Sequence, residues 1–206
     1  MTALTPANQL TLLRMLLIPA FVILVVYGHL GWALIVFITA GVTDALDGLA
    51  ARWTGEKTSL GAWLDPAADK LLLVTTFIVL TLPALGLANP LPIWLTVLII
   101  FRDIGIVLTV AIVNVAIGPR TFRPSIFGKI ATATYIVTAV VAMYFNYRGY
   151  HSAIVDLFVY ASLVITLYFN YLNLRSPVIT VFVYASLVIT IVSAFHYLIK
   201  VVHLGH

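Results

Sequence analysis

The chain has 206 residues, of which 63% are hydrophobic and only 9% are charged, and its formal net charge is +4. The mean hydropathy of +1.13 excludes an ordinary soluble domain. Cysteine is absent from the sequence, which excludes disulfides and thiolate metal ligands.

Apolar stretches of membrane-spanning length recur along the whole chain. A helix that crosses the hydrocarbon of a bilayer needs about 20 predominantly apolar residues. Seven stretches meet this length, at about 9–28, 31–51, 68–88, 91–117, 127–146, 151–172 and 177–200. We therefore predict an all-α integral membrane protein that forms a single membrane-embedded domain over residues 1–206.

Two of these stretches carry local signals. The first has no basic segment before it and is interrupted by Arg14 and Pro19, so we interpret it as a helix and not as a removable signal peptide. The pair Asp65-Pro66 favours the entrance of the third helix, because proline suits a first helical turn.

Basic residues are unevenly distributed among the predicted loops. The loops near 28–31 and 87–91 contain no Lys or Arg, whereas two other loops each carry a basic pair: Arg52 with Lys57, and Arg120 with Arg123. Lysine and arginine accumulate on the cytoplasmic side of membrane proteins. We therefore expect the two basic loops and the N-terminus on the cytoplasmic side.

Four aspartates lie within 26 residues of the most apolar half of the chain, in the pattern D-x2-D-G-x2-A-R-x8-G-x3-D-x3-D: Asp44, Asp47, Asp65 and Asp69. A charged side chain at bilayer depth costs roughly 2.5–3.5 kcal/mol on insertion scales, so such residues usually serve a function. The first two are three residues apart and the last two are four apart, so each pair shares one helix face. Two antiparallel helices can therefore direct four carboxylates into one cleft.

Carboxylates held so close together require cations. Oxygen ligands without His or Cys favour Mg²⁺, Mn²⁺ or Ca²⁺. Two such ions roughly 3.5–4 Å apart can hold a phosphoryl centre. As an alternative, the aspartates could form a structural salt-bridge set with Arg52 and Lys70, but four acids against two bases leave excess charge.

The positions between the aspartates fit a diphosphate ligand. Gly48 and Gly61 allow close approach of a ligand or of two helices, and both roles can hold together. Arg52 offers a planar fork for phosphate oxygens. Thr58 adds a hydroxyl donor.

A tandem repeat lies near the C-terminus. Residues 143–166 and 167–190 align at an offset of 24 with 14 identities, and both end in FVYASLVIT. Each unit is a turn followed by one helix, so the repeat predicts one additional C-terminal span. Seven spans place the C-terminus outside, whereas a copy lying in the interface would return the count to six.

The acidic pattern resembles the signature of the CDP-alcohol phosphotransferase family, and every fixed position is present. Other segments resemble its phosphatidylglycerophosphate synthase and eukaryotic-type cardiolipin synthase branches: Asn8 to Arg14 with Pro19, Asp65 to Lys70, Arg102-Asp103, Pro124 to Lys129, Thr132, and Thr190 to Ser193 with Tyr197. The resemblance implies a bundle of six core helices that transfers a phosphatidyl group from CDP-diacylglycerol to an alcohol and releases CMP.

The same resemblance implies roles for the acidic residues. Asp44, Asp47, Asp65 and Asp69 would bind two ions of Mg²⁺ or Mn²⁺, and Asp69 would also act as the general base. The resemblance further implies a homodimer in the bacterial inner membrane or an equivalent membrane, lipid substrates and no nucleic-acid partner. Because Arg52 and Lys57 flank the aspartates, we expect the active site near the cytoplasmic face.

The acceptor alcohol is less clearly defined. Glycerol 3-phosphate needs further cations, for which the candidates are Lys70, Arg102, Arg123 and Lys129, with Arg14 the least favoured. Bacterial phosphatidylglycerophosphate synthases usually carry K-x-K-T and a later Gln, whereas Ala131 and Thr134 stand in the second Lys and Gln places. We favour glycerol 3-phosphate and keep phosphatidylglycerol, and hence cardiolipin synthesis, as the alternative.

Two further interpretations concern charge in apolar segments. We expect Arg102 to face a cavity while its neighbour Asp103 points elsewhere, the alternative being that Arg102 is a buried partner of an aspartate. A cation channel or transporter is a remote alternative for the whole chain. We disfavour it because the acids cluster at one end and the repeat lacks them.

Overall fold

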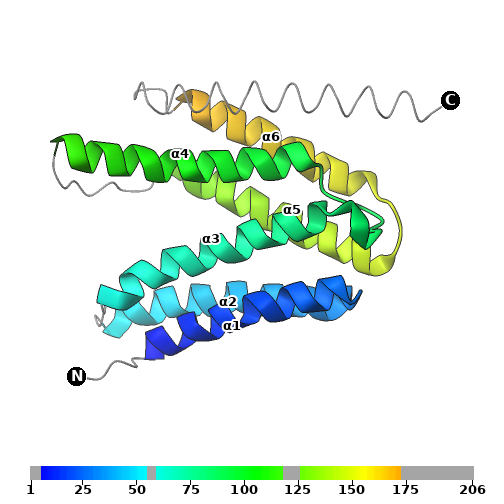
Figure 1. The fold of residues 1–206 in the computed structure, drawn as a ribbon, viewed down its shortest axis with the longest axis horizontal. Coiled ribbons are helices and arrows are strands. Elements are labelled where there is room, and N and C mark those ends of the chain that lie inside the picture. The colour runs from blue at the N-terminus through cyan, green and yellow to red at the C-terminus, as the bar shows by residue number, and fades with distance from the viewer. Residues whose placement is uncertain (1–5, 55–58, 118–125, 173–206) are drawn as a thin grey trace. The chain divides into compact units, whose positions relative to one another are not determined.

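The computed structural model describes residues 6–54, 59–117 and 126–172. These residues form six α-helices and one short 3₁₀ helix, and they contain no strand (Figure 1): α1 (Pro6–Val26), α2 (Leu30–Thr54), α3 (Ser59–Thr81), η1 (Pro83–Leu85), α4 (Ile93–Ile117), α5 (Ile126–Arg148) and α6 (Ala153–Leu172). The all-helical class is therefore confirmed for the described residues. The predicted span 177–200 and most of the second repeat copy lie outside them.

The third helix begins earlier than predicted. We expected its entrance at Asp65-Pro66, but α3 begins at Ser59, so that Pro66 lies inside the helix. Proline removes one helical hydrogen bond without necessarily ending a long helix. Pro19 inside α1 is a second example in this chain. The prediction wrongly treated Pro66 as a start signal.

The third helix also ends earlier than predicted, at Thr81 instead of 88. Leu82 precedes a proline and has extended backbone angles, φ −68° and ψ 116°, because the ring of Pro83 disfavours helical geometry in the preceding residue. One 3₁₀ turn follows and ends at Gly86, whose φ of 57° is left-handed. Pro83 therefore ends the helix, and the apolar residues around it led the prediction to extend the helix too far.

Only one described helical segment passes a joint test of length and hydropathy for a membrane span, namely Gly128–Arg148 in α5. Three shorter apolar segments occur in other helices: Thr11–Val26, Leu30–Asp44 and Ala153–Tyr168.

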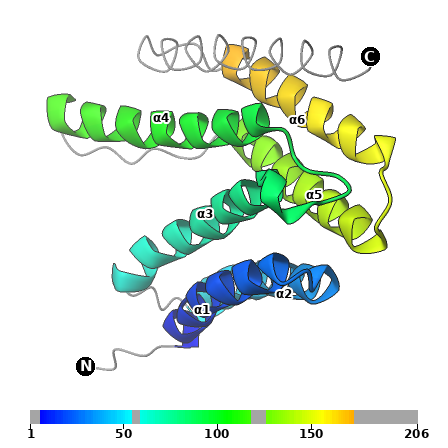
Figure 2. The same cartoon turned by 45° about the vertical axis from the view of Figure 1, so that its right-hand side comes forward.

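The described residues divide into two compact units. The first comprises the described residues of 1–90 together with 139–152, and the second comprises those of 91–138 and 153–206. In the first unit, α1 packs against both α2 and α3 (Figure 2). In the second unit, the rings of Trp94 on α4 and Tyr160 on α6 stack with centroids 6.3 Å apart.

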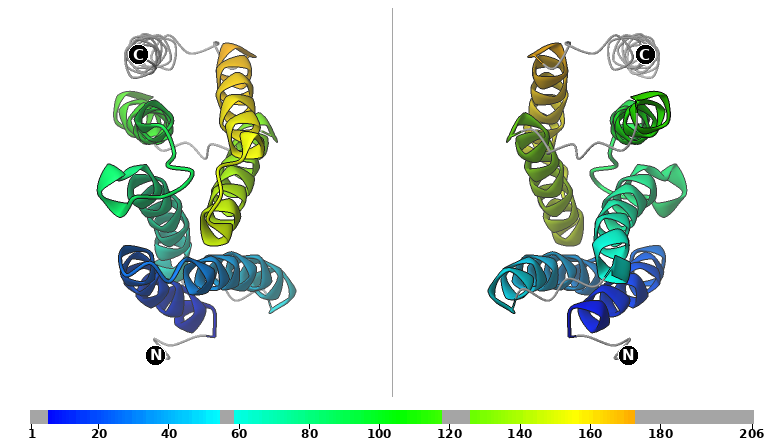
Figure 3. Two further views of the ribbon diagram at one scale, coloured as in Figure 1. Left: turned by 90° about the vertical axis from the view of Figure 1, so that its right-hand side faces the viewer. Right: turned by 90° about the vertical axis from the view of Figure 1, so that its left-hand side faces the viewer.

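The hairpin of α1 and α2 has a buried aromatic core. The rings of Phe21 and Phe37 lie with their centroids 6.1 Å apart, and both residues are buried. The two helices are neighbours joined by a short turn, and both lie at the same side of the first unit in the end-on views (Figure 3). Their side-by-side packing fixes which residues of α2 face each turn of α1.

A pair of asparagines ties together the loops of the first unit. The backbone N–H of Asn89 donates to Oδ1 of Asn146 (2.6 Å), and Nδ2 of Asn146 donates to the carbonyl of Asn89 (3.0 Å). In the side chain of Asn89, Nδ2 donates to the backbone carbonyl of Tyr150, and Oδ1 accepts from the backbone N–H of Ser152. The segment before α4 is thereby bonded to the end of α5 and to the turn that follows it.

We predict that Asn146→Ala lowers the free energy of unfolding by roughly 2–4 kcal/mol, since it leaves a buried N–H and a buried C=O of Asn89 without partners. Thermal denaturation of the purified protein in lipid or detergent measures this loss. Tyr150→Phe is the control, because it keeps the backbone carbonyl that accepts from Asn89. Equal melting temperatures for Asn146→Ala and the parent would contradict the prediction.

Candidate active site

The two aspartates of the acidic pattern whose side chains are described meet at one arginine. Nη2 of Arg14 lies 2.8 Å from Oδ1 of Asp44, and Nη1 donates a hydrogen bond of 2.6 Å to Oδ1 of Asp69. The three residues come from α1, α2 and α3 respectively. Carboxylates from two consecutive helices therefore reach the same cation.

The arginine and the carboxylates differ in exposure. The side chain of Arg14 is 1% exposed, whereas those of Asp44 and Asp69 are 40% and 42% exposed. The guanidinium therefore approaches the carboxylates from the interior. Each carboxylate keeps a side that a ligand can reach.

The packing of α1 against α2 sets this arrangement. Phe21 lies seven residues after Arg14, and Phe37 lies seven residues before Asp44. Residues seven apart occupy the same helix face, two turns from each other. The tilted pair of phenylalanines and the ion pair are thus two contacts of one helix interface, and the aromatic contact supports the position of the charged end.

Sequence reasoning underrated Arg14. It was the least favoured of the basic residues, while Arg52 and Lys70 were named as the bases nearest the acids. A signal was present, because an arginine in an apolar helix requires a buried partner. What the sequence lacked was the register of α1 against α2 and α3, which decides the partner.

Several predicted site residues cannot be compared with the structure. Thr58 and Arg123 lie outside the described residues. The surroundings of five further residues are not described either: Asp47, Gly48, Arg52, Gly61 and Asp65. Among the described side chains, no group of three or more His, Asp or Glu residues comes together. Lys70 and Lys129 are described and exposed.

The described pair of aspartates suits a hard divalent cation in its chemistry. Both residues supply carboxylate oxygens, which Mg²⁺ and Mn²⁺ prefer. A positively charged group, the guanidinium of Arg14, already contacts both of them. The place therefore tolerates and attracts positive charge.

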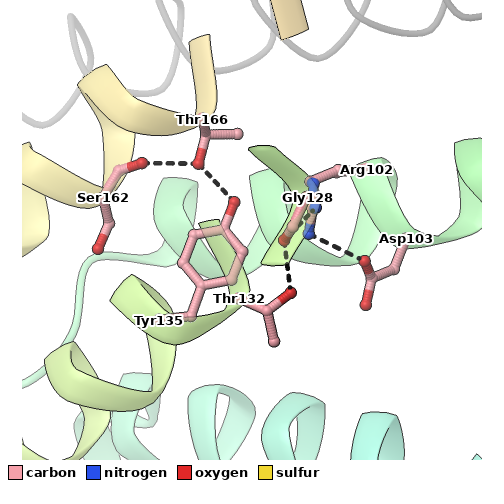
Figure 4. Close-up of polar contacts among 7 residues, drawn as sticks. All are labelled: Arg102, Asp103, Gly128, Thr132, Tyr135, Ser162 and Thr166. Atoms are coloured by element: carbon pink, nitrogen blue, oxygen red, sulfur yellow. Dashed lines mark hydrogen bonds and ion pairs between the residues drawn. The ribbon is translucent and has the colours of Figure 1, made fainter. Parts of the chain in front are cut away.

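A second polar cluster surrounds Arg102 in the other unit (Figure 4). Its Nη1 lies 3.4 Å from Oδ1 of Asp103, its Nη2 donates to the carbonyl of Gly128 (3.3 Å), and its guanidinium carbon lies 5.7 Å from the ring centroid of Tyr135. The expectation that Asp103 points elsewhere was wrong. A long arginine side chain can fold back along the helix to reach its neighbour, and the side chains of both residues are largely buried.

Hydroxyl groups continue this cluster between α5 and α6. The hydroxyl of Tyr135 bonds with that of Thr166, and the hydroxyls of Thr138 and Ser162 lie 2.7 Å apart. Thr166 also donates to the carbonyl of Ser162 (Figure 4). These contacts satisfy polar groups that would otherwise be buried without partners.

The sequence profile of the family described as CDP-alcohol phosphatidyltransferase matches residues 4–192. The chain belongs to this family. The resemblance inferred from the acidic pattern is therefore confirmed.

Curated relatives carry two kinds of name. A probable phosphatidylglycerophosphate synthase of Mycobacterium tuberculosis is 38% identical over 135 residues, which are 61% of this chain and 59% of the relative. The human cardiolipin synthase (CMP-forming) is 33% identical over 69% of this chain and 52% of its own length. The enzyme of the same name from Streptomyces coelicolor is 30% identical over 77% of this chain and 74% of its own length. The match thus spans little more than half of the first two relatives.

The Arg102 cluster predicts a graded response to substitution of Tyr135. Tyr135→Phe keeps the ring beside Arg102 and loses the bond to Thr166, so the free energy of unfolding should fall by about 1 kcal/mol. Tyr135→Leu also removes the aromatic face and should cost about 1–2 kcal/mol more. Chemical or thermal denaturation orders the three proteins, and a phenylalanine variant less stable than the leucine variant would contradict the assignment.

Proposed function

We propose that this protein is a phosphatidyltransferase that moves a phosphatidyl group from CDP-diacylglycerol to glycerol 3-phosphate and releases CMP. The observation that carries the proposal is the meeting of Asp44 and Asp69 at one cation within the family's acidic pattern. The mycobacterial relative named phosphatidylglycerophosphate synthase supports this acceptor.

The proposed reaction is a displacement at phosphorus. The acceptor hydroxyl oxygen forms a bond to the phosphorus that carries the diacylglycerol, and the bond from that phosphorus to the CMP oxygen breaks. CMP leaves with the electron pair, and the hydroxyl proton passes to a carboxylate. We assign this base role to Asp69, which is ionically held by Arg14 yet 42% exposed.

Binding of the diphosphate is assigned to the acidic pattern as a whole. Asp44, Asp47, Asp65 and Asp69 would hold two ions of Mg²⁺ or Mn²⁺. When bound, such ions neutralise the diphosphate and make CMP a better leaving group. The donor would also contact Arg52 and Thr58, and it would approach closely at Gly48 and Gly61.

The proposed contacts to glycerol 3-phosphate involve Lys70, Arg123 and Lys129. Arg102 is a less direct candidate, because its guanidinium already contacts Asp103 and Gly128 and its side chain is 10% exposed. We place it in support of α4 and α5, where it orients the segment that carries Lys129.

Cardiolipin synthesis, with phosphatidylglycerol as the acceptor, is the second candidate. The human and Streptomyces relatives carry that name. Ala131, at the place of the second lysine of bacterial phosphatidylglycerophosphate synthases, is 2% exposed, and such a buried position does not suit a lysine. Thr134, at the glutamine place, donates its hydroxyl to the carbonyl of Ile130.

Membrane insertion is proposed from exposed apolar surface in addition to hydropathy. Large apolar side chains with exposures above 50% occur on each described α-helix: Leu16, Trp32, Leu71, Ile93, Ile126 and Leu157 among others. So many exposed large apolar side chains are unusual for a soluble monomer. Lipid contact accounts for them.

Aromatic residues mark one end of the first unit. Tyr27 and Trp32 lie where α1 meets α2, and they are 74% and 65% exposed. A side chain at Gly31 would touch the ring of Tyr147, which places the end of α5 at the same level. Tyrosine and tryptophan gather at membrane interfaces. Asp44 lies 12 residues along α2 from Trp32, about 18 Å away, so we propose that the acidic site lies in the other half of the bilayer, on the cytoplasmic side.

Replacing either described aspartate should abolish turnover. We predict that Asp69→Asn lowers the rate of CMP release by roughly 10²–10⁴-fold, the usual contribution of a general base, and that Asp44→Asn lowers it at least as much. Asp156→Asn is the matched control, since Asp156 is an exposed acid in the first turn of α6. CMP release from CDP-diacylglycerol with Mn²⁺ or Mg²⁺ is the measurement, and a normal rate for Asp69→Asn would remove its role as base.

The acceptor can be decided by a direct comparison. With CDP-diacylglycerol and Mn²⁺, we expect CMP release to depend on glycerol 3-phosphate and to yield a phosphatidylglycerol phosphate. Cardiolipin formed from phosphatidylglycerol, without a response to glycerol 3-phosphate, would transfer the assignment to the second candidate. Chelation of divalent ions should stop CMP release with either acceptor.

A further inference from the structure

The acidic site contains a cation supplied by the protein itself. Arg14 is 1% exposed and contacts a carboxylate on each of two neighbouring helices. Its Nε has no hydrogen-bond partner among the described residues, and its Nη2 contacts Asp44 outside hydrogen-bond geometry. The packing around this guanidinium is therefore governed by charge more than by ideal hydrogen bonding.

We propose that Arg14 is a fixed counter-ion and positioning residue, which holds Asp44 and Asp69 together from the buried side before a divalent ion binds. The inference rests on the proposed function, because it takes these aspartates to be ligands of that ion. Arg14 itself is not placed against the substrate.

The geometry distinguishes this role from that of a competitor for the metal. A competing side chain would occupy the open side of the carboxylates and would leave when the ion arrived. Arg14 instead contacts them from the buried side, while Asp44 and Asp69 remain 40% and 42% exposed. An ion can therefore approach from the exposed side while the guanidinium stays in place.

The electrostatic consequence follows from the number of acids. Asp44 and Asp69 carry like charges at one place and repel one another when the site holds no metal. Without Arg14, nothing described on α1 offsets Asp44 and Asp69, and α2 and α3 would separate at this end. A divalent ion would then have to supply the attraction that the arginine supplies now.

The test compares melting temperatures of the purified full chain in EDTA and in saturating Mn²⁺. Arg14→Met should lower the melting temperature in EDTA by roughly 5 °C or more, and Mn²⁺ should restore most of this loss. The metal-induced shift should therefore be larger in Arg14→Met than in the parent. Arg102→Met is the matched control, because Arg102 is also a buried arginine beside one aspartate. The decrease in melting temperature of this variant should be the same in EDTA and in Mn²⁺.

A second variant separates a counter-ion from a merely structural side chain. Asp44→Asn introduced into Arg14→Met removes one of the repelling charges, so the double variant should melt higher in EDTA than Arg14→Met alone. If Arg14→Met does not fold, the double variant should recover folded protein. The inference would be overturned if Arg14→Met lowered the melting temperature equally in EDTA and in Mn²⁺. It would also be overturned if the double variant were no more stable in EDTA than Arg14→Met.

The two proposals fail in different ways. A parent protein that releases no CMP and does not respond to Mn²⁺ would end the proposed function. The comparison in EDTA needs no metal and would still decide whether Arg14 offsets the charges of the aspartates.

Discussion

The contact of one buried arginine with two carboxylates determines how the first three helices can be arranged. Arg14 lies in an apolar helix, where an unpaired charge is costly, so α1 must present it to acids. The acids lie on two different helices, and satisfying both fixes the rotation of α2 and α3 about their axes. The aromatic contact of Phe21 with Phe37 supports the same register two turns away. The same contacts therefore position the charged residues of the site and set the packing of the helices.

The sequence predicted the elements of the fold well and their ends less well. Apolar stretches located six helices because length and hydropathy are properties of contiguous residues. The ends of α3 were misjudged because two prolines in apolar surroundings have opposite effects. Pro66 lies within the helix, whereas Pro83 forces Leu82 out of helical geometry. Composition alone does not distinguish these cases, since the outcome depends on what surrounds the freed carbonyl.

The sequence placed the acids on helix faces and did not reveal the cation that two of them contact. Spacing placed pairs of aspartates on common helix faces, and the meeting of Asp44 and Asp69 agrees with that expectation. Spacing within a helix says nothing of the register between helices, so Arg14 was passed over in favour of bases nearer in sequence. The same limit applies to Arg102, where a rule about adjacent residues failed because the side chain is long enough to turn back toward Asp103. A long, flexible arginine side chain can reach a residue that helix geometry places on another face.

The two buried arginines show how similar pairs lead to different chemistry. Arg102 faces one aspartate, a carbonyl and an aromatic ring, so its charge is nearly balanced and its cluster has little need of another ion. Arg14 faces two aspartates, so its single positive charge is shared between two negative charges that remain partly exposed. Under the function proposed above, such a place would attract divalent cations and would repel a diphosphate until they have bound. Under the function proposed above, this arrangement would favour an order of events in which the metal binds before the lipid donor.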